Sequence, residues 1–504
     1  MLVPTLLAAS VFFYLYSSIL FAAILASSIL INFSIGKRIN LSIKYKYHWL
    51  LAGLFINVGY ICLFKYTDVI SGLFSFIGNH NINSYSLPLG ISFYSFTQMG
   101  YLFDQFEGEK PEKKLINYSL FVSFFPSVSS GPIIQNDDVG KQLRQLTFKQ
   151  FNIEKITRGF CLLLIGLFKK VILADSVANI ANEVYRAVNA KVNINSLEAW
   201  IGAVSYSLQL YFDFSGYSDI AIGLAWMIGI NLPWNFNSPY KAVNIVDFWR
   251  RWHISLSNWL NNYVFEPINY GYTKKAKSIP FLSKTSGLGG YLLGTFVTMF
   301  LCGLWHGATL NFILWGLFHV VLIFANRFWN MFKARPGLKS DSKNQSSAAI
   351  WSSRLLTFVS VTFAWVLFRT TNLGSAINMW KAMIGGNGFY ISEAFAKRFG
   401  IVINNPGFKF HFTSLSHPIF TESMFAIAVN LFLLLLVVFL LPNSREIMCN
   451  QCKVPRSLFV KKIAKFFTVE NGWRPSYVWL LIMSVMTISL VTWNKVAEFL
   501  YFNF

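Results

Sequence analysis

Long apolar stretches alternate with short polar segments along the whole chain. A helix that crosses a bilayer needs about 20 mostly apolar residues, and several stretches reach or approach that length. They are 5–33, 48–64, 160–177, 288–303, 308–326, 352–369, 424–441 and 477–493. Three more stretches, 85–103, 116–134 and 200–230, carry polar residues that in lipid must face protein or a cavity. The pattern predicts about eleven membrane-spanning helices.

Clusters of Lys and Arg orient these predicted helices. The clusters lie at 37–46, 274–284, 327–343 and 445–465. Basic residues are enriched in cytoplasmic loops. Two predicted spans lie between the second and third clusters, and two lie between the third and fourth. We therefore expect all four clusters to be cytoplasmic, and the link 304–307 and the segment 370–423 to face outward.

Composition supports a polytopic membrane protein. Of the 504 residues 54% are hydrophobic and only 13% are charged, where soluble chains have about 25% charged residues. The 51 Phe, 22 Tyr and 16 Trp exclude disorder, and five cysteines exclude a disulfide scaffold. The net charge of +22 would suggest nucleic acid as the partner of a soluble protein. Here it indicates cytoplasmic loops that contact anionic membrane lipids.

Residues 248–263, FWRRWHISLSNWLNNY, have an aromatic side and a polar side at helical spacing. At 100° per residue Trp252 and His253 fall on the aromatic side, while Arg250 and Arg251 fall opposite. The pattern predicts one amphipathic helix at the membrane interface. His253 is then either an interfacial histidine with a satisfied ring or a functional residue, and this segment alone leaves both open.

His306 lies between Trp305 and Gly307, at the junction of two apolar stretches. An ionisable side chain in such a place favours a functional role, because its burial costs free energy; a satisfied core histidine is the alternative. We expect apolar surroundings to keep the ring neutral at pH 7, and Gly307 and Ala308 to leave room for a substrate chain. His319 lies on a different face of its predicted helix and is expected to be structural.

Two carboxylates occur inside the apolar stretch YFDFSGYSDIAIG at 211–223. Six residues separate Asp213 from Asp219, so on one helix they point apart, and Gly216 is a candidate helix break between them. We expect both to hydrogen-bond to His, Arg or backbone groups inside the bundle rather than to act on a substrate.

Other motifs that carry chemistry find little support. Cys449 and Cys452 form a lone CxxC without a second pair at zinc spacing, so no metal site is predicted. The sequence has no GxSxG, no P-loop and no GxGxxG between a strand and a helix. Hydrolase and nucleotide-binding chemistry of the soluble type are therefore not expected.

Several sequence blocks between residues 87 and 369 occur in the same order as motifs of a known protein family. They are LPLGISFYSF at 87–96, Gly131 with Pro132, GLFKKVILAD at 166–175, LYFDFSGYSDIAIGL at 210–224, NFNSPY at 235–240, FWRRWHISLSNWL at 248–260, GLWHGATLNFILWG at 303–316 and FAWVLFR at 363–369. These blocks resemble the membrane-bound O-acyltransferases, in particular the bacterial branch with the alginate and peptidoglycan O-acetylation membrane proteins. The resemblance covers most of residues 50–370.

The resemblance implies an all-α polytopic membrane protein, with re-entrant or interfacial helices around a tunnel through the bilayer. His306 matches the catalytic histidine of the family, and His253 matches the second histidine of this branch. Residues expected to line or support the tunnel are Asp213, Ser215, Tyr217, Asp219, Trp252, Trp305 and Asn311. We expect 1–504 to form one domain, with a core at 50–370 and an extension at 371–504 that ends in two spans.

The implied function is O-acetyl transfer in the inner membrane of a bacterium. Acetyl would come from a cytoplasmic thioester, with acetyl-CoA as the expected donor, and no bound cofactor is expected. Because the polysaccharide hydroxyl lies outside, acetyl must cross the bilayer, and a periplasmic acetyltransferase of the SGNH type is the expected partner. Deprotonating an alcohol needs a base, which suits a neutral histidine. We expect His253 near the inner edge and His306 near the outer edge to bracket the path.

Two alternative functions stay open beside O-acetyl transfer, and the sequence differs from the family pattern at one turn. A transporter without chemistry would use Asp213, Asp219 and His306 as substrate or proton sites, but it predicts internal repeats, which the sequence lacks. Transfer of D-alanine to teichoic acid is the alternative within the family. The chain also has EPINYG at 266–271 where relatives usually have Pro-Leu-Gly-Gly-Asn-Arg, so roles of that turn are not carried over.

The basic clusters lead to a prediction of topology. We expect a cysteine placed near Thr413 to react with an impermeant thiol reagent from the outside, and one placed near Lys277 only from the cytoplasm. Reagents added to intact cells and to inverted vesicles make the measurement. Labelling near Thr413 only from the cytoplasm would overturn the predicted topology.

Overall fold

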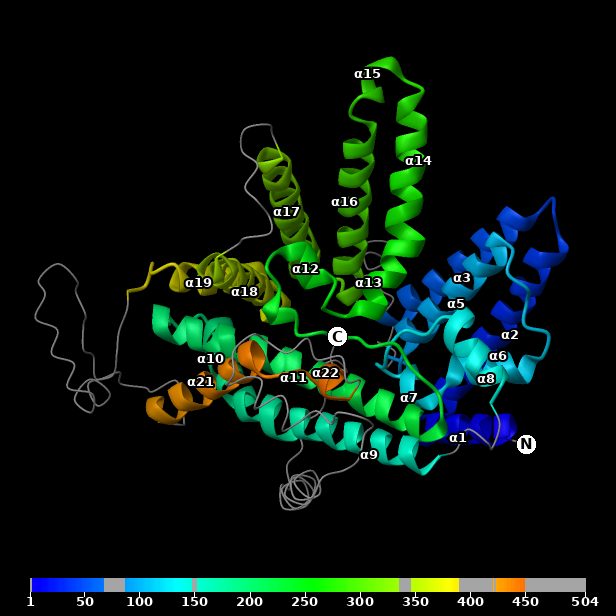
Figure 1. Ribbon diagram of the computed structural model, residues 1–504, viewed down its shortest axis with the longest axis horizontal. Coiled ribbons are helices and arrows are strands. Elements are labelled where there is room, and N and C mark those ends of the chain that lie inside the picture. The colour runs from blue at the N-terminus through cyan, green and yellow to red at the C-terminus, as the bar shows by residue number, and fades with distance from the viewer. Residues whose placement is uncertain are drawn as a thin grey trace, which may run out of the picture.

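The computed structural model describes residues 2–67, 87–146, 152–334, 346–388, 420 and 423–448. In that part of the chain the secondary structure is entirely helical, which confirms the all-α class. Figure 1 shows an N-terminal group of helices, a long helix pair across the middle, and helices that project away from this pair. The predicted span 477–493 and most of the segment 370–423 lie outside the described residues.

The N-terminal group begins with a helix pair where the sequence predicted one span. Its helices are α1 (Leu2–Ser17), α2 (Ile19–Leu41), α3 (Lys46–Lys65), α5 (Ile91–Glu107), α6 (Leu115–Ser123) and α7 (Phe125–Val128). The predicted span 5–33 is divided at Ser18, where the backbone is extended. The Ser18 hydroxyl caps α2 by accepting a hydrogen bond from the Phe21 amide. The predicted span 116–134 is likewise divided, since α6 and α7 are separate short helices.

The middle of the protein is a pair of helices packed through glycines. The pair is α9 (Ile153–Phe168) and α11 (Ser196–Ile228), which are connected by the π-helical turn η3 (Lys169–Ala174) and by α10 (Asp175–Asn189). A Cβ added at Gly159 would lie 2.4 Å from the Gly223 carbonyl oxygen, and one at Gly216 would lie 2.7 Å from that of Gly166. Small residues allow this close backbone approach in membrane bundles. The expectation of a helix break at Gly216 is therefore wrong, because α11 continues through it.

The remaining helices form the projecting part and the side that faces α10. They are α12 (Ile245–Trp249), α13 (Ile254–Leu260), the π-helical turn η5 (Asn261–Phe265), α14 (Glu266–Lys277), α15 (Pro280–Ser283), α16 (Ser286–His306), α17 (Leu310–Lys333), α18 (Ser347–Arg369), α19 (Leu373–Met383), α21 (Met424–Leu440) and α22 (Ser444–Met448). Short connecting turns are η1 (Asn136–Gly140), α8 (Lys141–Arg144) and η4 (Pro239–Lys241). Figure 1 shows α14 and α16 side by side, with α15 at the tip of their hairpin.

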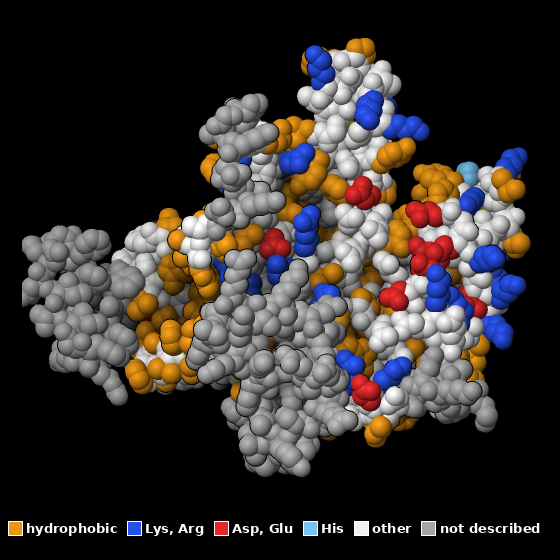
Figure 2. All heavy atoms as spheres, viewed as in Figure 1, with side chains coloured by type: hydrophobic (Ala, Val, Ile, Leu, Met, Phe, Trp, Pro, Cys, Tyr) orange, Lys and Arg blue, Asp and Glu red, His pale blue; other side chains and the backbone are white. Residues whose placement is uncertain are grey.

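Five helices in the described residues are long and apolar enough to cross a membrane. They are α2, α3, α16, α17 and α18, and α1 and α21 are shorter apolar helices. The chain is thus a polytopic membrane protein, but the predicted number of eleven spans is not confirmed. Lys and Arg side chains gather on the projecting hairpin and on the edge of the N-terminal group (Figure 2), which matches the predicted basic loops.

Buried ion pairs connect η3 to α11. The Lys170 ammonium lies 2.7 Å from Asp213 and 3.0 Å from Asp175, and Lys169 lies 2.7 Å from Asp219. The expected partners of the two α11 carboxylates were His, Arg or backbone groups, and the structure corrects this to lysines. The reason is the close approach of the two helices, which brings the lysines directly opposite the carboxylates.

These pairs give a prediction about stability. Replacing Lys170 by Met removes the nearest cation from the buried Asp213 carboxylate, and breaking a buried pair costs about 3–5 kcal/mol. We expect a lower midpoint of thermal unfolding in detergent, monitored by size-exclusion chromatography. The double variant Lys170→Met with Asp213→Leu should recover only part of the loss, because Asp175 still lacks its lysine. Lys155→Met on the exposed side of α9 is the matched control. Equal midpoints for Lys170→Met and the wild type would contradict the prediction.

Candidate functional site

His306 is the last residue of α16, where this helix packs closely on α17. A Cβ at Gly303 would lie 2.4 Å from the Phe312 carbonyl oxygen, and one at Gly316 would lie 2.3 Å from that of Met299. The two backbones therefore touch directly over the last turns of α16. This contact fixes the direction in which His306 leaves the helix.

Aromatic rings surround the His306 imidazole, which is 7% exposed. Its ring centroid lies 4.5 Å from that of Trp305, 4.8 Å from Phe368 and 5.2 Å from Trp315. Gly307 does not leave room for a substrate as expected, because a Cβ there would lie 2.5 Å from the Phe312 ring. The small residue is needed for the packing of Phe312 instead.

His253 occupies a turn, because the predicted helix 248–263 is interrupted. α12 ends at Trp249 and α13 begins at Ile254, and His253 between them has φ of +43°, a conformation that non-glycine residues rarely adopt. The aromatic side of the segment is nevertheless packed as predicted, with Trp252 and Trp259 buried. The prediction was wrong in taking 248–263 as one continuous helix, because the break at His253 depends on backbone partners from elsewhere in the chain.

Asn235 and Ser255 hold this turn in place. The Ile254 amide donates to the Asn235 carbonyl at 2.9 Å, and the Ser255 hydroxyl donates to the Asn235 side-chain oxygen at 2.6 Å. The Ser255 oxygen also accepts from the Ile133 amide at 2.9 Å. Sequence reasoning did not single out Asn235, although it lies in the NFNSPY block that carries part of the family resemblance.

The two histidines share one neighbour, the Trp305 indole. The His253 ring lies edge-on to Phe214 at 4.7 Å and 6.2 Å from Trp305, which in turn contacts His306. His253 is therefore buried in the interior of the bundle, against the same indole as His306. It lies outside the candidate spans, and burial lowers the pKa of its ring to about 3, so it is neutral at physiological pH.

His319 has the surroundings of a structural residue. Its Nδ1 accepts a hydrogen bond of 3.3 Å from the Trp249 indole, and it packs between Trp249 and Trp315. The side chain is fully buried. These contacts agree with the structural role expected from the sequence.

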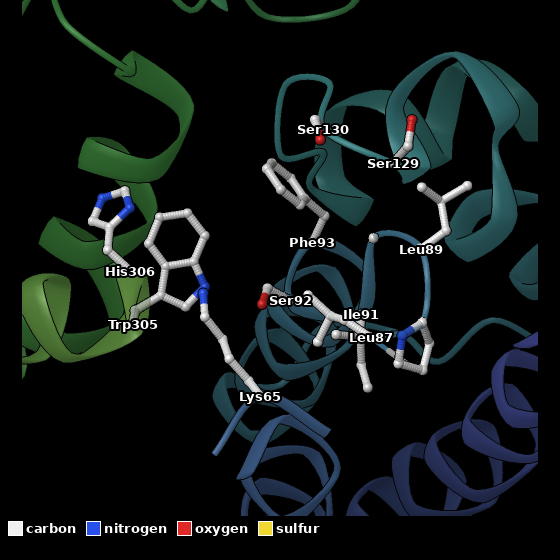
Figure 3. A pocket seen from close by; sticks show the side chains of 12 residues that line it. Lys65, Leu87, Leu89, Ile91, Ser92, Phe93, Ser129, Ser130, Trp305 and His306 are labelled. Carbon is white, nitrogen blue, oxygen red and sulfur yellow. The ribbon is translucent and has the colours of Figure 1, made fainter. Parts of the chain in front are cut away.

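A cavity of about 100 Å³ reaches His306 and Trp305. Figure 3 shows the serine side of this cavity opposite the two α16 residues, with Lys65 at its edge. Its lining residues are Lys65, Leu87, Pro88, Leu89, Gly90, Ile91, Ser92, Phe93, Ser129, Ser130, Trp305 and His306. Gly90 has φ of +66°, and a Cβ there would lie 2.0 Å from the Val128 carbonyl oxygen, so this wall of the cavity requires glycine.

Lys65 was missed by sequence reasoning. It directly follows the predicted span 48–64, and a lysine at a span end usually indicates a side chain that reaches the interface. Only the contact of the end of α3 with α16, through Lys65 on the Trp305 ring and Tyr66 on the Leu304 carbonyl, brings it to the same cavity as His306.

A second cavity, of about 490 Å³, lies further along α16. Its walls include Tyr291, Thr295 and Met299 of α16 together with Arg250 and Asn258. The two cavities share no lining residue, and Met299 is about 10 Å from His306 along the helix axis. The larger cavity is within the usual range of ligand pockets, roughly 300–1,000 Å³.

Of the residues expected to line or support a tunnel, Trp305 borders the small cavity. Tyr217 reaches its wall indirectly, through a hydrogen bond between its hydroxyl and that of Ser129. Asn311 donates to the Thr370 carbonyl at 2.9 Å and so ties the start of α17 to the end of α18.

The other expected residues lie away from both cavities. Trp252 is stacked on Phe248 and packs on Trp365, and Ser215 is buried inside α11. Asp213 and Asp219 are in the ion pairs with the lysines of η3. These four residues support the bundle and do not border either cavity. Within the described residues no group of three His, Cys, Asp or Glu could hold a metal ion.

Comparison with known proteins agrees with this architecture. The family model of the membrane-bound O-acyltransferases matches residues 107–363, which include both histidines. A peptidoglycan O-acetyltransferase of Helicobacter pylori is 34% identical over 412 residues, which cover 76% of this chain and 74% of that protein. The chain therefore belongs to the membrane-bound O-acyltransferase family and is an acyltransferase.

Two further relatives show the breadth of the similarity. A probable alginate O-acetylase of Pseudomonas putida is 34% identical over 402 residues, which cover 77% of this chain and 76% of that protein. A teichoic acid D-alanyltransferase of Bacillus subtilis is 31% identical over 290 residues, or 57% of this chain and 69% of that protein.

The hydrogen bond by which Asn235 stabilises the turn at His253 can be tested. Asn235→Ala removes the acceptor of the Ser255 side chain, so the turn loses a hydrogen bond that keeps His253 against Trp305. We expect acyl transfer to fall about tenfold or more at unchanged protein level in the membrane. Asn231→Ala, at an exposed position of the same loop, is the control. Full activity of Asn235→Ala would show that this turn does not support the reaction.

Proposed function

We propose that this protein is an O-acetyltransferase in which His306 is the general base. The observation that carries the proposal is a buried imidazole at the edge of a cavity of about 100 Å³. That volume is well below the roughly 300 Å³ of the smallest common ligand pockets, so it suits an acetyl group better than a long acyl chain.

The reaction that we propose forms one bond and breaks one. His306 takes the proton of an acceptor hydroxyl, and the oxygen attacks the carbonyl carbon of an acetyl thioester. The carbon–sulfur bond then breaks, and the leaving thiolate receives the proton from the imidazolium. The products are an acetyl ester and a free thiol. In this proposal Trp305 and Phe368 exclude water from the base, which favours transfer over hydrolysis.

We propose acetyl-CoA as the donor and the second cavity as its approach. This cavity opens beside Arg250 and Asn258, on the part of α16 nearer to the basic residues 274–284. Cationic residues favour the phosphates of a nucleotide thioester. The larger volume, about 490 Å³, suits the arm that carries the thioester sulfur.

The acceptor side of the proposal follows from the relatives. Because relatives are named peptidoglycan O-acetyltransferase and probable alginate O-acetylase, we propose that the acetyl group is destined for an envelope polysaccharide. The chain would then reside in the inner membrane and pass acetyl to a periplasmic acetyltransferase of the SGNH type. A gene for such a protein beside this one would support the relay.

D-Alanyl transfer remains the second candidate function. The relative named for it covers 57% of this chain, against 76% for the peptidoglycan O-acetyltransferase. The alternative of a transporter without chemistry loses its support, since the family is defined by acyl transfer.

Replacement of His306 by Ala tests the proposed base. We expect acetylation of the polysaccharide in cells to fall by 10² to 10⁴, the usual effect of losing a general base. The variant should still accumulate in the membrane, because one side chain is a small part of the packing. His48→Ala, an exposed histidine at the start of α3, is the control. Wild-type acetylation with normal expression would remove His306 from the mechanism.

A further inference from the structure

The first turns of α18 carry a cation on the side of this helix that packs into the bundle. Phe358 lies edge-on to Tyr240 at 5.1 Å, and two turns further along Trp365 lies 5.0 Å from Trp252. Arg354 precedes Phe358 by four residues and therefore shares its face of the helix. Arg354 is thus directed toward the segment that contains η4 and α12.

Arg354 forms no ion pair with a carboxylate in the part of the chain that the structure describes. Its Nε is buried and has no hydrogen-bond partner among the described residues. The guanidinium lies 5.1 Å from the centroid of the Trp351 ring, and the charged groups that act on it through space are Arg251 and Asp247. A half-buried cation in a membrane protein is costly unless an anion or water compensates it.

Arg251 supplies a second guanidinium, which is already held in place. Its Nε donates to the Asp247 carboxylate at 2.8 Å, and its Nη1 donates to the Asn237 carbonyl at 3.2 Å. The side chain is nevertheless 30% exposed. One carboxylate therefore faces two guanidinium groups, so the three side chains together carry a net positive charge. The planar fork of a guanidinium matches the oxygens of a phosphate.

The outer side of the same helical turns is apolar. Leu355 and Leu356 are 59% and 69% exposed, and Trp351 is 44% exposed. Because α18 is one of the helices that can cross a membrane, this side faces acyl chains. The helix begins just after the basic cluster 327–343, which the sequence places on the cytoplasmic side. A ligand that fits both surfaces carries a phosphate joined to acyl chains.

We propose that Arg354 and Arg251 bind the phosphate of an anionic membrane lipid, whose acyl chains lie over Leu355 and Leu356. Anionic lipids are abundant in the cytoplasmic leaflet, where this end of α18 is predicted to lie. The phosphates of a nucleotide thioester have the same chemistry, but neither arginine lines the cavity proposed for the donor. The lipid site is separate from His306 and does not depend on acyl transfer.

Binding of two matched lipids tests the proposal. The probes are dioleoyl phosphatidylglycerol and dioleoylglycerol, which has the same acyl chains and no phosphate. Native mass spectrometry of the purified full-length protein, after equilibration with each lipid in detergent, counts the bound molecules. The wild type should bind the first phosphatidylglycerol roughly tenfold or more tightly than dioleoylglycerol, as for charge-assisted hydrogen bonds.

Three variants locate the effect. Arg354→Met should bind the two lipids about equally, whereas Arg354→Lys should keep part of the preference, because it keeps the charge and loses the fork. Lys333→Met is the matched control, since the exposed Lys333 also lies over a tryptophan of its own helix, 5.0 Å from the Trp329 ring. This control should keep the full preference. Size-exclusion chromatography confirms that each variant is folded, and the comparison of lipids in the wild type needs no variant.

Coenzyme A and inorganic phosphate distinguish the possible sources of the phosphate. Neither should displace phosphatidylglycerol at millimolar concentration, because neither carries acyl chains. Displacement by coenzyme A would assign the arginines to the donor, and displacement by inorganic phosphate would assign them to a free anion; either result would overturn the lipid site. Equal binding of the two lipids by the wild type, an unchanged preference in Arg354→Met, or the same loss in Lys333→Met would overturn it as well.

Discussion

Polar groups inside a membrane bundle need partners, and this constraint organises the structure. Water is absent from the hydrocarbon core, so a charged or hydrogen-bonding side chain must be satisfied within the protein. Here the contact between α9 and α11 depends on glycines at their interface, and it places the lysines of η3 against Asp213 and Asp219. The turn between α12 and α13 packs on α11, where the His253 ring lies 4.7 Å from that of Phe214.

The Trp305 indole is the common element of the site. His253 approaches it from the turn between α12 and α13, His306 follows it in α16, and Lys65 reaches it from α3. An indole has two faces and an edge, so one ring can separate three ionisable groups and still hold them close. The arrangement keeps the proposed base in apolar surroundings and leaves a small polar cavity beside it.

The contacts of His253 show how a local pattern can be right about burial and wrong about shape. Periodicity correctly assigned Trp252 and Trp259 to the packed side, because burial of an aromatic face depends on spacing along the chain. It missed the interruption at His253, because the turn is held by Asn235 and by the Ile133 amide. These partners are distant in sequence, and no helical period records them.

The sequence by itself determined the class of protein, the spans at α3, α16, α17 and α18, and the histidine at the junction of two of them. These features follow from the length and polarity of local segments, which the bilayer constrains directly. Only the tertiary structure decided that Lys170 pairs with Asp213, that Gly307 makes room for Phe312, and that Lys65 borders the cavity of His306. Each of these depends on which helices lie side by side, and that is set by packing between distant segments rather than by the composition of any one of them.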